Sequence, residues 1–311
     1  MKSSSFLLLL LLLSFDSRAS RADTLYSTAC GNPRRPAIIF LHGGPGYNAY
    51  SFEESTADSL AKRGFYVIVY DQRGSGRSES YKGKYTYNES VEDLRSVYDR
   101  YHLKKATLMG HSWGGAIATL FAARYPERVR SMILVSAPLS FQRTLHTIMQ
   151  NYVIKFPDTS SMEHVEWEIV NGLDPASFQY SSGAFRLAMT GGFYRTKEPN
   201  ERAKALWNDI GADDTAHWSS HMSFPPVLGL FKNEHYTLLD ITDTLKHLSK
   251  QIPVFGIYGD EDGLFDPAER DHIRMVIGPN HMSVVQGASH NVFIDQQAEF
   301  LDRVAADLKT N

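Results

Sequence analysis

Apolar and polar positions follow two alternating periods over the first 138 residues. Four short apolar runs are continuous and rich in β-branched side chains, which is typical of strands buried on both faces; they lie at residues 36–43, 65–71, 106–110 and 131–138. Three segments with helical spacing separate them, at residues 50–63, 88–101 and 113–125. Asn88 or Ser90 can cap the second helix. The alternation predicts an α/β fold with a mostly parallel sheet flanked by helices.

The alternation stops at about residue 139 and returns at about residue 251. Between these points the chain has helical patterns and many aromatic residues, but no convincing run of strands. The pattern then resumes with a strand, a helix, a strand and a closing helix, at residues 252–259, 267–277, 282–287 and 294–309. We therefore expect a core made of residues 23–138 and 251–311, with residues 139–250 inserted as a helical cap.

The first 22 residues predict an export signal. Lys2 supplies a positive charge, residues 6–13 are apolar, and small residues from Ser17 to Ala22 offer cleavage positions. The apolar run is much shorter than the roughly 20 residues that span a bilayer. A membrane anchor is the weaker alternative. We expect a periplasmic or secreted protein with no stable membrane insertion after the signal is removed.

The composition is that of a globular protein and excludes some kinds of binding partner. Of the 311 residues, 42% are hydrophobic, which is enough for a sizeable core. The formal net charge is −3 and no basic run is visible, so we expect no nucleic-acid partner. Cys30 is the only cysteine, which excludes an internal disulfide. The oligomeric state does not follow from these values.

Ser112 lies in the pattern Gly-His-Ser-Trp-Gly, between Gly110 and Gly114. The pattern alone is weakly specific, but a predicted strand ends just before it and a predicted helix begins at about Trp113. A nucleophilic serine needs this sharp strand-to-helix turn, and glycines remove Cβ atoms that would clash there. We therefore expect Ser112 to be a catalytic nucleophile rather than a small residue in an ordinary turn.

A serine nucleophile needs a histidine base and a carboxylate that orients the histidine. On this type of sheet the order along the chain is serine, acid, histidine. His290 follows the last predicted strand, and an acidic loop follows the strand before it. Within this loop we favour Asp262 over Asp260, because it lies far enough past the strand to turn back towards the histidine. Ser112, Asp262 and His290 form the predicted triad.

A glycine turn follows the first strand, in the sequence Leu-His-Gly-Gly-Pro-Gly. Acyl transfer needs two N–H donors that face the developing oxyanion. Trp113, the residue after the nucleophile, would supply one donor, and Gly44 or Gly43 would supply the other. We expect His42 to shape this turn. The alternative is an ordinary Gly-Pro turn.

Three motifs together resemble the proline iminopeptidase family of α/β-hydrolase serine peptidases: HGGPG at 42–46, DQRGSGRS at 71–78 and GHSWGG at 110–115. The resemblance implies an α/β-hydrolase fold, the same triad, Gly44 and Trp113 as oxyanion donors, and removal of N-terminal proline or another small apolar residue. It covers residues 36–138 and 252–309. Such domains usually begin with an edge hairpin, for which only residues 24–31 are available here, so we expect a missing strand or an irregular edge.

The cap matches the family only loosely. An aminopeptidase must hold a charged amino terminus, and residues 233–239 are similar to a family segment that contains Glu, His and Tyr. By this resemblance Glu234 would bind the amino terminus; as a structural residue it would be a solvated helix side chain. Other candidates, with no better support, are Glu163, Glu166 and Glu168.

Rival chemistries are weaker. His217 and His221 have helical spacing, but Trp218 stands where a zinc protease would need a glutamate, so we expect no metal site. The DQRGSGRS segment is too short for a dinucleotide fingerprint, and we expect it to be a structural turn with Asp71 and Arg73 in buried polar contacts; no cofactor is implied.

Two alternatives to a peptidase stay open. One is a carboxylesterase or lactonase with the same triad, which would act on a small ester instead of a peptide. The other is a non-catalytic binding protein.

Overall fold

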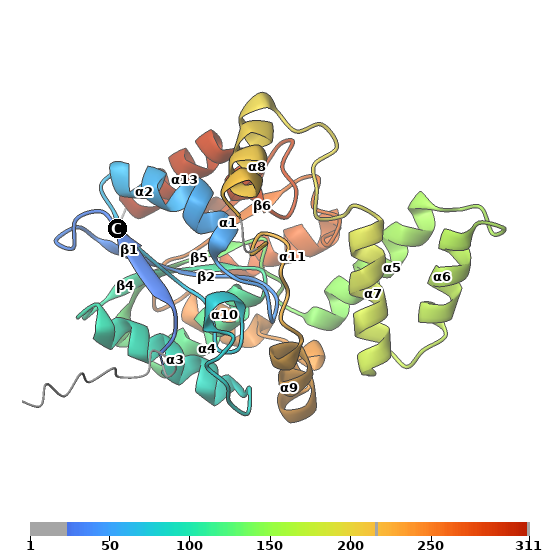
Figure 1. Cartoon of the computed structure of the whole chain (residues 1–311), viewed down its shortest axis with the longest axis horizontal. Coiled ribbons are helices and arrows are strands. Elements are labelled where there is room, and N and C mark those ends of the chain that lie inside the picture. The colour runs from blue at the N-terminus through green and yellow to red at the C-terminus, as the bar shows by residue number, and fades with distance from the viewer. Residues whose placement is uncertain (1–23, 215–216, 310–311) are drawn as a thin grey trace, which may run out of the picture.

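The computed structural model describes residues 24–214 and 217–309. A seven-stranded sheet forms its centre, in the order β1-β3-β2-β4-β5-β6-β7 (Figure 1). The strands are β1 (Ser27–Cys30), β2 (Ala37–Leu41), β3 (Tyr66–Tyr70), β4 (Ala106–His111), β5 (Val129–Val135), β6 (Val254–Gly259) and β7 (Met282–Val285). Neighbouring strands are parallel except for β1, which runs antiparallel to β3. The predicted α/β fold with a mostly parallel sheet is confirmed.

Successive residues of each central strand face opposite sides of the sheet, and each side has its own apolar core. Ile39 and Leu41 of β2 lie in one cluster, and Ile38 and Phe40 lie in the other. All five residues of β2 are buried. Burial on both faces explains why these strands are continuous apolar runs rather than alternating ones.

Helices cover both faces of the sheet (Figure 1). Buried side chains of four helices join the first cluster: α3 (Tyr87–Arg100), α4 (Trp113–Arg124), α10 (Thr242–Leu248) and α11 (Pro267–Ile277). Those of four others join the second: α1 (Tyr50–Phe52), α2 (Asp58–Lys62), α12 (Val292–Asp295) and α13 (Gln297–Lys309).

Two local predictions differ from the structure. The helix expected at 50–63 is divided, because a π-helical turn, Glu53–Ala57, lies between α1 and α2. Neither Asn88 nor Ser90 caps α3; the N-cap is Thr86, whose hydroxyl accepts from the Glu89 N–H while the Glu89 side chain returns to the Thr86 N–H. This reciprocal capping box satisfies two backbone donors, and it lies two residues upstream of the first expected cap.

The sheet edge before the first core strand is short. β1 is a single strand whose four half-buried residues pair only with β3. Within the described residues it is the one strand beyond β3 at this edge, so a strand of the usual hairpin is missing, as expected.

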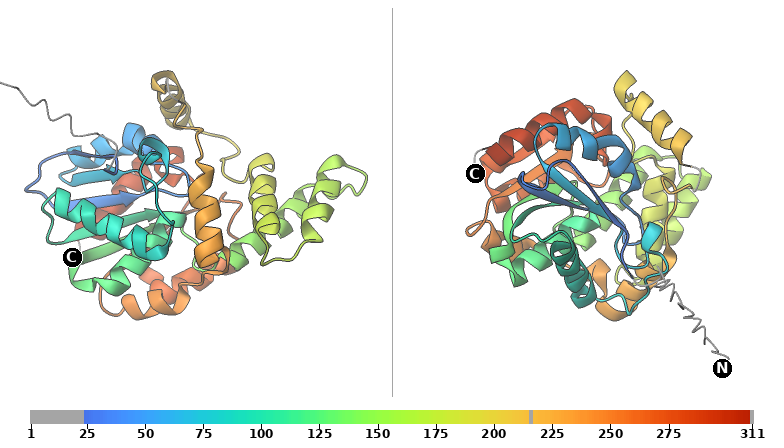
Figure 2. Two further views of the ribbon diagram at one scale, coloured as in Figure 1. Left: turned by 60° about the horizontal axis from the view of Figure 1, so that its bottom comes forward. Right: turned by 60° about the vertical axis from the view of Figure 1, so that its left-hand side comes forward.

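The helices between β5 and β6 fall into two groups. The helices α5 (Phe141–Lys155), α6 (Met162–Asn171) and α7 (Phe178–Thr190) project away from the sheet, as both Figures 1 and 2 show. By contrast, α8 (Glu201–Asp213) packs Leu206 and Ile210 into the second cluster of the core. The next helix, α9 (Phe224–Glu234), lies beside the first cluster through Leu230. We keep residues 139–250 as the proposed cap, with α5–α7 as its projecting part.

The predicted export signal, residues 1–22, lies outside the described residues. In the part of the chain that is described, none of the helices combines the length and the apolar character needed to cross a bilayer.

Candidate active site

The three residues of the predicted triad lie at one edge of the sheet. Ser112 follows β4, Asp262 lies three residues after β6, and His290 lies five residues after β7. Because β4, β6 and β7 all run in the same direction, their carboxyl ends meet at the same edge. Ligand sites of open α/β sheets gather there.

Ser112 occupies a strained turn between β4 and α4. Its backbone has φ 50° and ψ −122°, a conformation that residues other than glycine rarely adopt. Its N–H donates to the Val135 carbonyl at 2.9 Å, so the turn is fixed to β5. A Cβ on Gly114 would lie 2.1 Å from the Leu41 carbonyl oxygen, so only glycine lets α4 approach β2 this closely. The half-buried serine side chain is thereby held at the start of the helix.

The structure brings His290 and Asp262 together. His290 Nδ1 lies 2.8 Å from Asp262 Oδ2, and both residues are buried. The other carboxylate oxygen of Asp262 accepts from the Leu264 N–H at 3.1 Å. Asp260 instead accepts from the Gly287 N–H at 2.7 Å and does not contact the imidazole. The geometry therefore gives the orienting position to Asp262 and gives Asp260 a contact with the backbone of the histidine loop.

His111 connects the serine turn to the histidine loop. Its Nε2 lies 3.0 Å from the His290 carbonyl oxygen, and the two imidazole rings are 4.9 Å apart between centroids. Burial holds the pKa of His111 well below its ordinary value, so the ring is neutral and donates through Nε2–H. His290 is thus fixed beside the residue that precedes Ser112.

The glycine turn lies against the serine. A Cβ on Gly43 would be 3.1 Å from the Ser112 Cβ. His42 donates through Nδ1 to the Gly43 carbonyl at 2.7 Å and accepts at Nε2 from the Gln72 N–H at 2.8 Å. Among the described residues, the N–H groups of Gly43, Gly44 and Trp113 have no acceptor. Free N–H groups on both sides of Ser112 are what an oxyanion hole requires.

Residues 36–297 match the family described as the alpha/beta hydrolase fold. The chain belongs to the α/β-hydrolase family. One similar relative is a proline iminopeptidase of Saccharolobus solfataricus, 27% identical over 86% of this chain and 85% of its own. Among solved structures, a proline iminopeptidase-related protein of Thermus thermophilus has a TM-score of 0.70 and 24% identity, over 92% and 93% of the two chains. A carboxylesterase structure from Nitrososphaera gargenis has a TM-score of 0.60 and 21% identity, over 92% and 94%.

Glu234 of this α/β hydrolase is linked to the serine turn by one residue, Tyr87, which contacts both Glu234 and Trp113. It is the last residue of α9, and its Oε1 accepts from the Tyr87 N–H at 2.8 Å. Tyr87 begins α3 and packs its ring 6.2 Å from that of Trp113. The carboxylate thus stabilises a helix N-terminus. It is half-buried rather than a freely solvated side chain.

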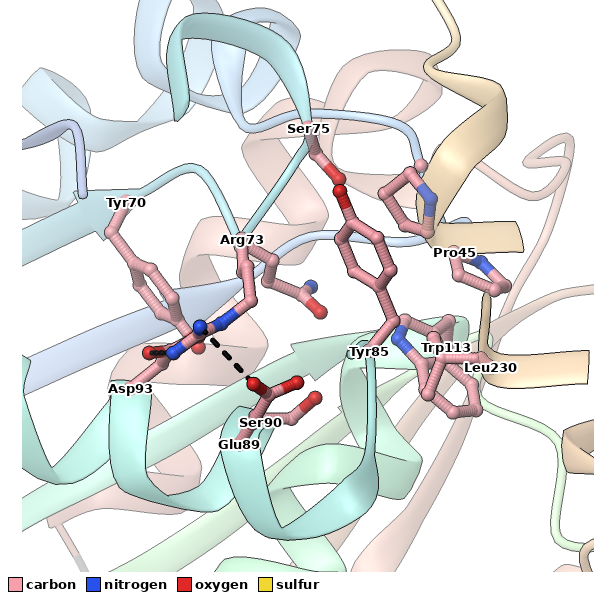
Figure 3. A pocket seen from close by; sticks show the side chains of 13 residues that line it. Pro45, Tyr70, Arg73, Ser75, Tyr85, Glu89, Ser90, Asp93, Trp113 and Leu230 are labelled. Atoms are coloured by element: carbon pink, nitrogen blue, oxygen red, sulfur yellow. Dashed lines mark hydrogen bonds and ion pairs between the residues drawn. The ribbon is translucent and has the colours of Figure 1, made fainter. Parts of the chain in front are cut away.

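A narrow pocket, lined in part by Trp113, Arg73 and Asp93, lies beside the serine turn (Figure 3). Arg73 crosses it and pairs with Asp93 at 2.5 Å and with Glu89 at 3.4 Å. Asp71, fully buried, pairs with Arg77 at 2.8 Å. The expectation of buried polar contacts for Asp71 and Arg73 agrees with these pairs, which fix the segment that holds His42.

The two histidines of the rejected metal hypothesis lie in a loop. His217 is exposed, and His221 Nε2 lies 3.4 Å from Glu79 Oε1. Across residues 24–214 and 217–309, no group of three or more His, Cys, Asp or Glu side chains is arranged to hold a metal ion.

Two residues that the sequence analysis did not identify position the histidine loop. Asp295, buried in α12, accepts from the Ser289 N–H at 2.8 Å and from its hydroxyl at 2.5 Å. The Ser289 hydroxyl also lies 2.8 Å from the Tyr194 carbonyl, which belongs to the segment between α7 and α8. Ser289 adjoins His290 in the sequence, but its partners lie 6 and 95 positions away, and no local pattern marks them.

Proposed function

We propose that this α/β hydrolase is a serine hydrolase that works through an acyl-enzyme. The observation that carries the proposal is the 2.8 Å contact between His290 Nδ1 and Asp262, beside the strained turn of Ser112. A buried carboxylate holds the imidazole in the tautomer that leaves Nε2 free to accept a proton. This is the arrangement that nucleophilic catalysis by Ser112 would require.

In the proposed reaction the Ser112 hydroxyl oxygen attacks the substrate carbonyl carbon. His290 Nε2 takes the hydroxyl proton and then gives it to the leaving amine or alcohol as the carbon–leaving-group bond breaks. The backbone N–H of Trp113 and that of Gly43 or Gly44 stabilise the oxyanion of each tetrahedral intermediate. A water, deprotonated by His290, then hydrolyses the ester on Ser112 and returns the free enzyme.

We propose an aminopeptidase that releases N-terminal proline or another small apolar residue from peptides. Support comes from the iminopeptidase relative, which matches most of both chains, and from the HGGPG and GHSWGG motifs. Glu234 is the proposed ligand of the substrate ammonium. Its Oε1 is bonded to the Tyr87 N–H, and a carboxylate has further lone pairs to offer.

The second candidate is a carboxylesterase or lactonase. It is favoured by the carboxylesterase structure of similar fold. The two candidates share the triad and differ in the leaving group, which is an amine in the first and an alcohol in the second.

A fluorophosphonate probe and two substrate series test the proposal. We expect the probe to label wild type at Ser112 and to leave Ser112→Ala unlabelled. Absence of labelling in wild type would refute the serine-hydrolase proposal and favour a binding protein. Turnover of proline arylamides supports the peptidase, whereas turnover of p-nitrophenyl esters without any arylamide turnover rejects it.

We further propose that the protein is exported, on the strength of the charged and apolar N-terminal segment. Fractionation of cells that express the full chain tests this, together with N-terminal sequencing of the recovered protein. Recovery of an uncleaved chain in the cytosol would exclude it.

A further inference from the structure

The chain enters and leaves the insertion through two adjacent segments, residues 139–141 and 239–241, which we call the neck. The Phe141 N–H donates to the Leu239 carbonyl at 3.2 Å, and the Ile241 N–H donates to the Leu139 carbonyl at 2.8 Å. Ser140 and Asp240 form an antiparallel bridge between these bonds. The neck is therefore a short ladder that joins both crossings.

A pocket of about 100 Å³ lies against the neck. This is several times the roughly 10–15 Å³ that one water needs. Residues from both crossings and from α5, α10 and α11 line it, and none of them belongs to the sheet edge that carries Ser112, Asp262 and His290. The pocket is thus a separate feature of the molecule, built where the insertion meets the core.

Four titratable or charged side chains line this neck pocket: Arg143, Asp240, Glu269 and His272. In residues 24–214 and 217–309, no direct ion pair joins any two of the four, and neither Arg143 nor His272 makes a hydrogen bond. His272 is nevertheless near enough to Asp240, and Arg143 to Glu269, for their charges to interact. Asp240 accepts from the Thr242 N–H at 2.9 Å. The pocket therefore holds neighbouring groups of both signs that are not in direct contact.

Glu269 is the buried member of this group, with 2% of its surface exposed. The hydroxyls of Thr144 and Thr147 lie 3.0 and 3.3 Å from its two oxygens. Burial raises its pKa to about 7, and the positive charge of Arg143 offsets the loss of solvation only in part. A second cation, placed in the pocket, would further stabilise the ionised form of the Glu269 carboxyl group.

We propose that the neck pocket binds a free α-amino acid with a small apolar side chain. The ligand ammonium would lie towards Glu269 and Asp240, and its carboxylate towards Arg143 and His272. Leu139 and Ile273, which also line the pocket, would contact the side chain. A simple anion could contact only Arg143 and His272, and a simple cation only Asp240 and Glu269, whereas a zwitterion matches both signs.

An amino acid in this pocket would contact both crossings of the neck and helix α11 of the core. It would therefore stabilise one orientation of the insertion relative to the sheet. Binding does not depend on the proposed function. An effect on turnover does, because free amino acids are the products of an aminopeptidase.

Isothermal titration calorimetry on the full mature chain tests the proposal, with L-alanine and L-proline as ligands. We expect Arg143→Gln to weaken binding about tenfold or more, the loss that follows removal of a charge-assisted hydrogen bond. The control is Arg130→Gln, which removes an exposed arginine of β5 and should leave binding unchanged. Arg143→Lys, which keeps the charge without the planar fork, should bind with intermediate affinity.

Acetate and ethylammonium carry one charge each, so they should bind at least about tenfold more weakly than alanine. Three results would each overturn the proposal. One is equal amino-acid affinity of Arg143→Gln and wild type, another is equal affinity of wild type for acetate and alanine, and the third is no binding of either amino acid to wild type. Fluorophosphonate labelling of the same samples reports separately on Ser112, so failure of the proposed function and failure of the neck pocket are distinguishable.

Discussion

The sheet edge that carries Ser112, Asp262 and His290 and the neck pocket differ in how their charged groups are satisfied. At the edge, Asp262 and His290 are in direct contact at 2.8 Å. At the neck pocket, Arg143 and Glu269 line the same space without an ion pair. The edge is thus organised before any substrate arrives, as catalysis requires, whereas the neck pocket is organised only in part. Changes at the edge should therefore alter rate, and changes at the neck pocket should alter stability and ligand binding.

The largest effect expected at the edge is that of Ser112→Ala. Activity should fall by a factor on the order of 10⁵–10⁶, as in other serine enzymes that lose the nucleophile. The melting temperature should stay within a few degrees, because one half-buried hydroxyl is lost. Ser80→Ala, at an exposed position, is the control for both measurements. A large fall in melting temperature with retained activity would make Ser112 a structural residue.

Asp262→Asn should lower kcat by a factor on the order of 10⁴ with little change in the fold, because the amide favours the wrong imidazole tautomer. Asp260→Asn is the matched control, since Asp260 bonds to the Gly287 N–H instead of the ring. Steady-state kinetics of both variants decide between them. If Asp260→Asn were the more damaging change, the acid of the triad would be misassigned.

Glu269→Gln tests the neck pocket through pH. The pKa of Glu269 is raised from 4.5 to about 7 in the folded state, so the folded protein holds the proton more tightly than the unfolded chain. The free energy of unfolding should therefore fall as pH rises from about 4.5 to about 7, by on the order of 3 kcal/mol from this group. Urea unfolding at several pH values should show a flatter dependence in Glu269→Gln. An unchanged profile would mean that Glu269 does not titrate in this range.

Glu234→Gln tests whether the insertion contributes to substrate binding. A glutamine can still accept from the Tyr87 N–H, so the start of α3 should be preserved. KM for proline arylamides should rise about tenfold, the cost of losing one charged partner, and KM for esters should not change. Glu127→Gln, at an exposed position between α4 and β5, is the control. Equal effects on arylamides and esters would remove Glu234 from recognition of the ammonium.

The same contrast explains what could be predicted from the sequence. β2 to β6 were predicted because their burial on both faces appears in the sequence as apolar runs, and the shorter, partly buried β7 was predicted as well. Ser112 follows β4 directly, and Asp262 and His290 lie three and five residues after β6 and β7. Their proximity follows from parallel strands alone. The choice of Asp262 rested on loop length, and the structure brings that residue to His290.

The neck pocket had no comparable signal in the sequence. Arg143 and Glu269 are 126 positions apart and come together where α5 lies against α11, since Thr144 and Thr147 of α5 both contact Glu269. The cap of α3 was missed for a more local reason, since the Thr86–Glu89 box lies just ahead of the helical pattern. The contact of Asp295 with Ser289 likewise depends on how α12 packs. Long-range contacts such as those of Glu269 and Asp295 are not encoded in patterns of three to five residues, whereas the Thr-x-x-Glu box is such a pattern.

The position of the insertion also has a consequence for synthesis. β5 pairs with β6 through Met132 and Val254, which are 122 positions apart. On a ribosome, β1 to β5 emerge well before their next neighbour, so β5, whose seven residues are apolar except for Arg130 and Ser131, presents an unpaired edge meanwhile. Nascent chains that stop within the insertion should therefore aggregate more readily than full-length ones. The demand for chaperones should fall once β6 has paired with β5 and β7 has paired with β6.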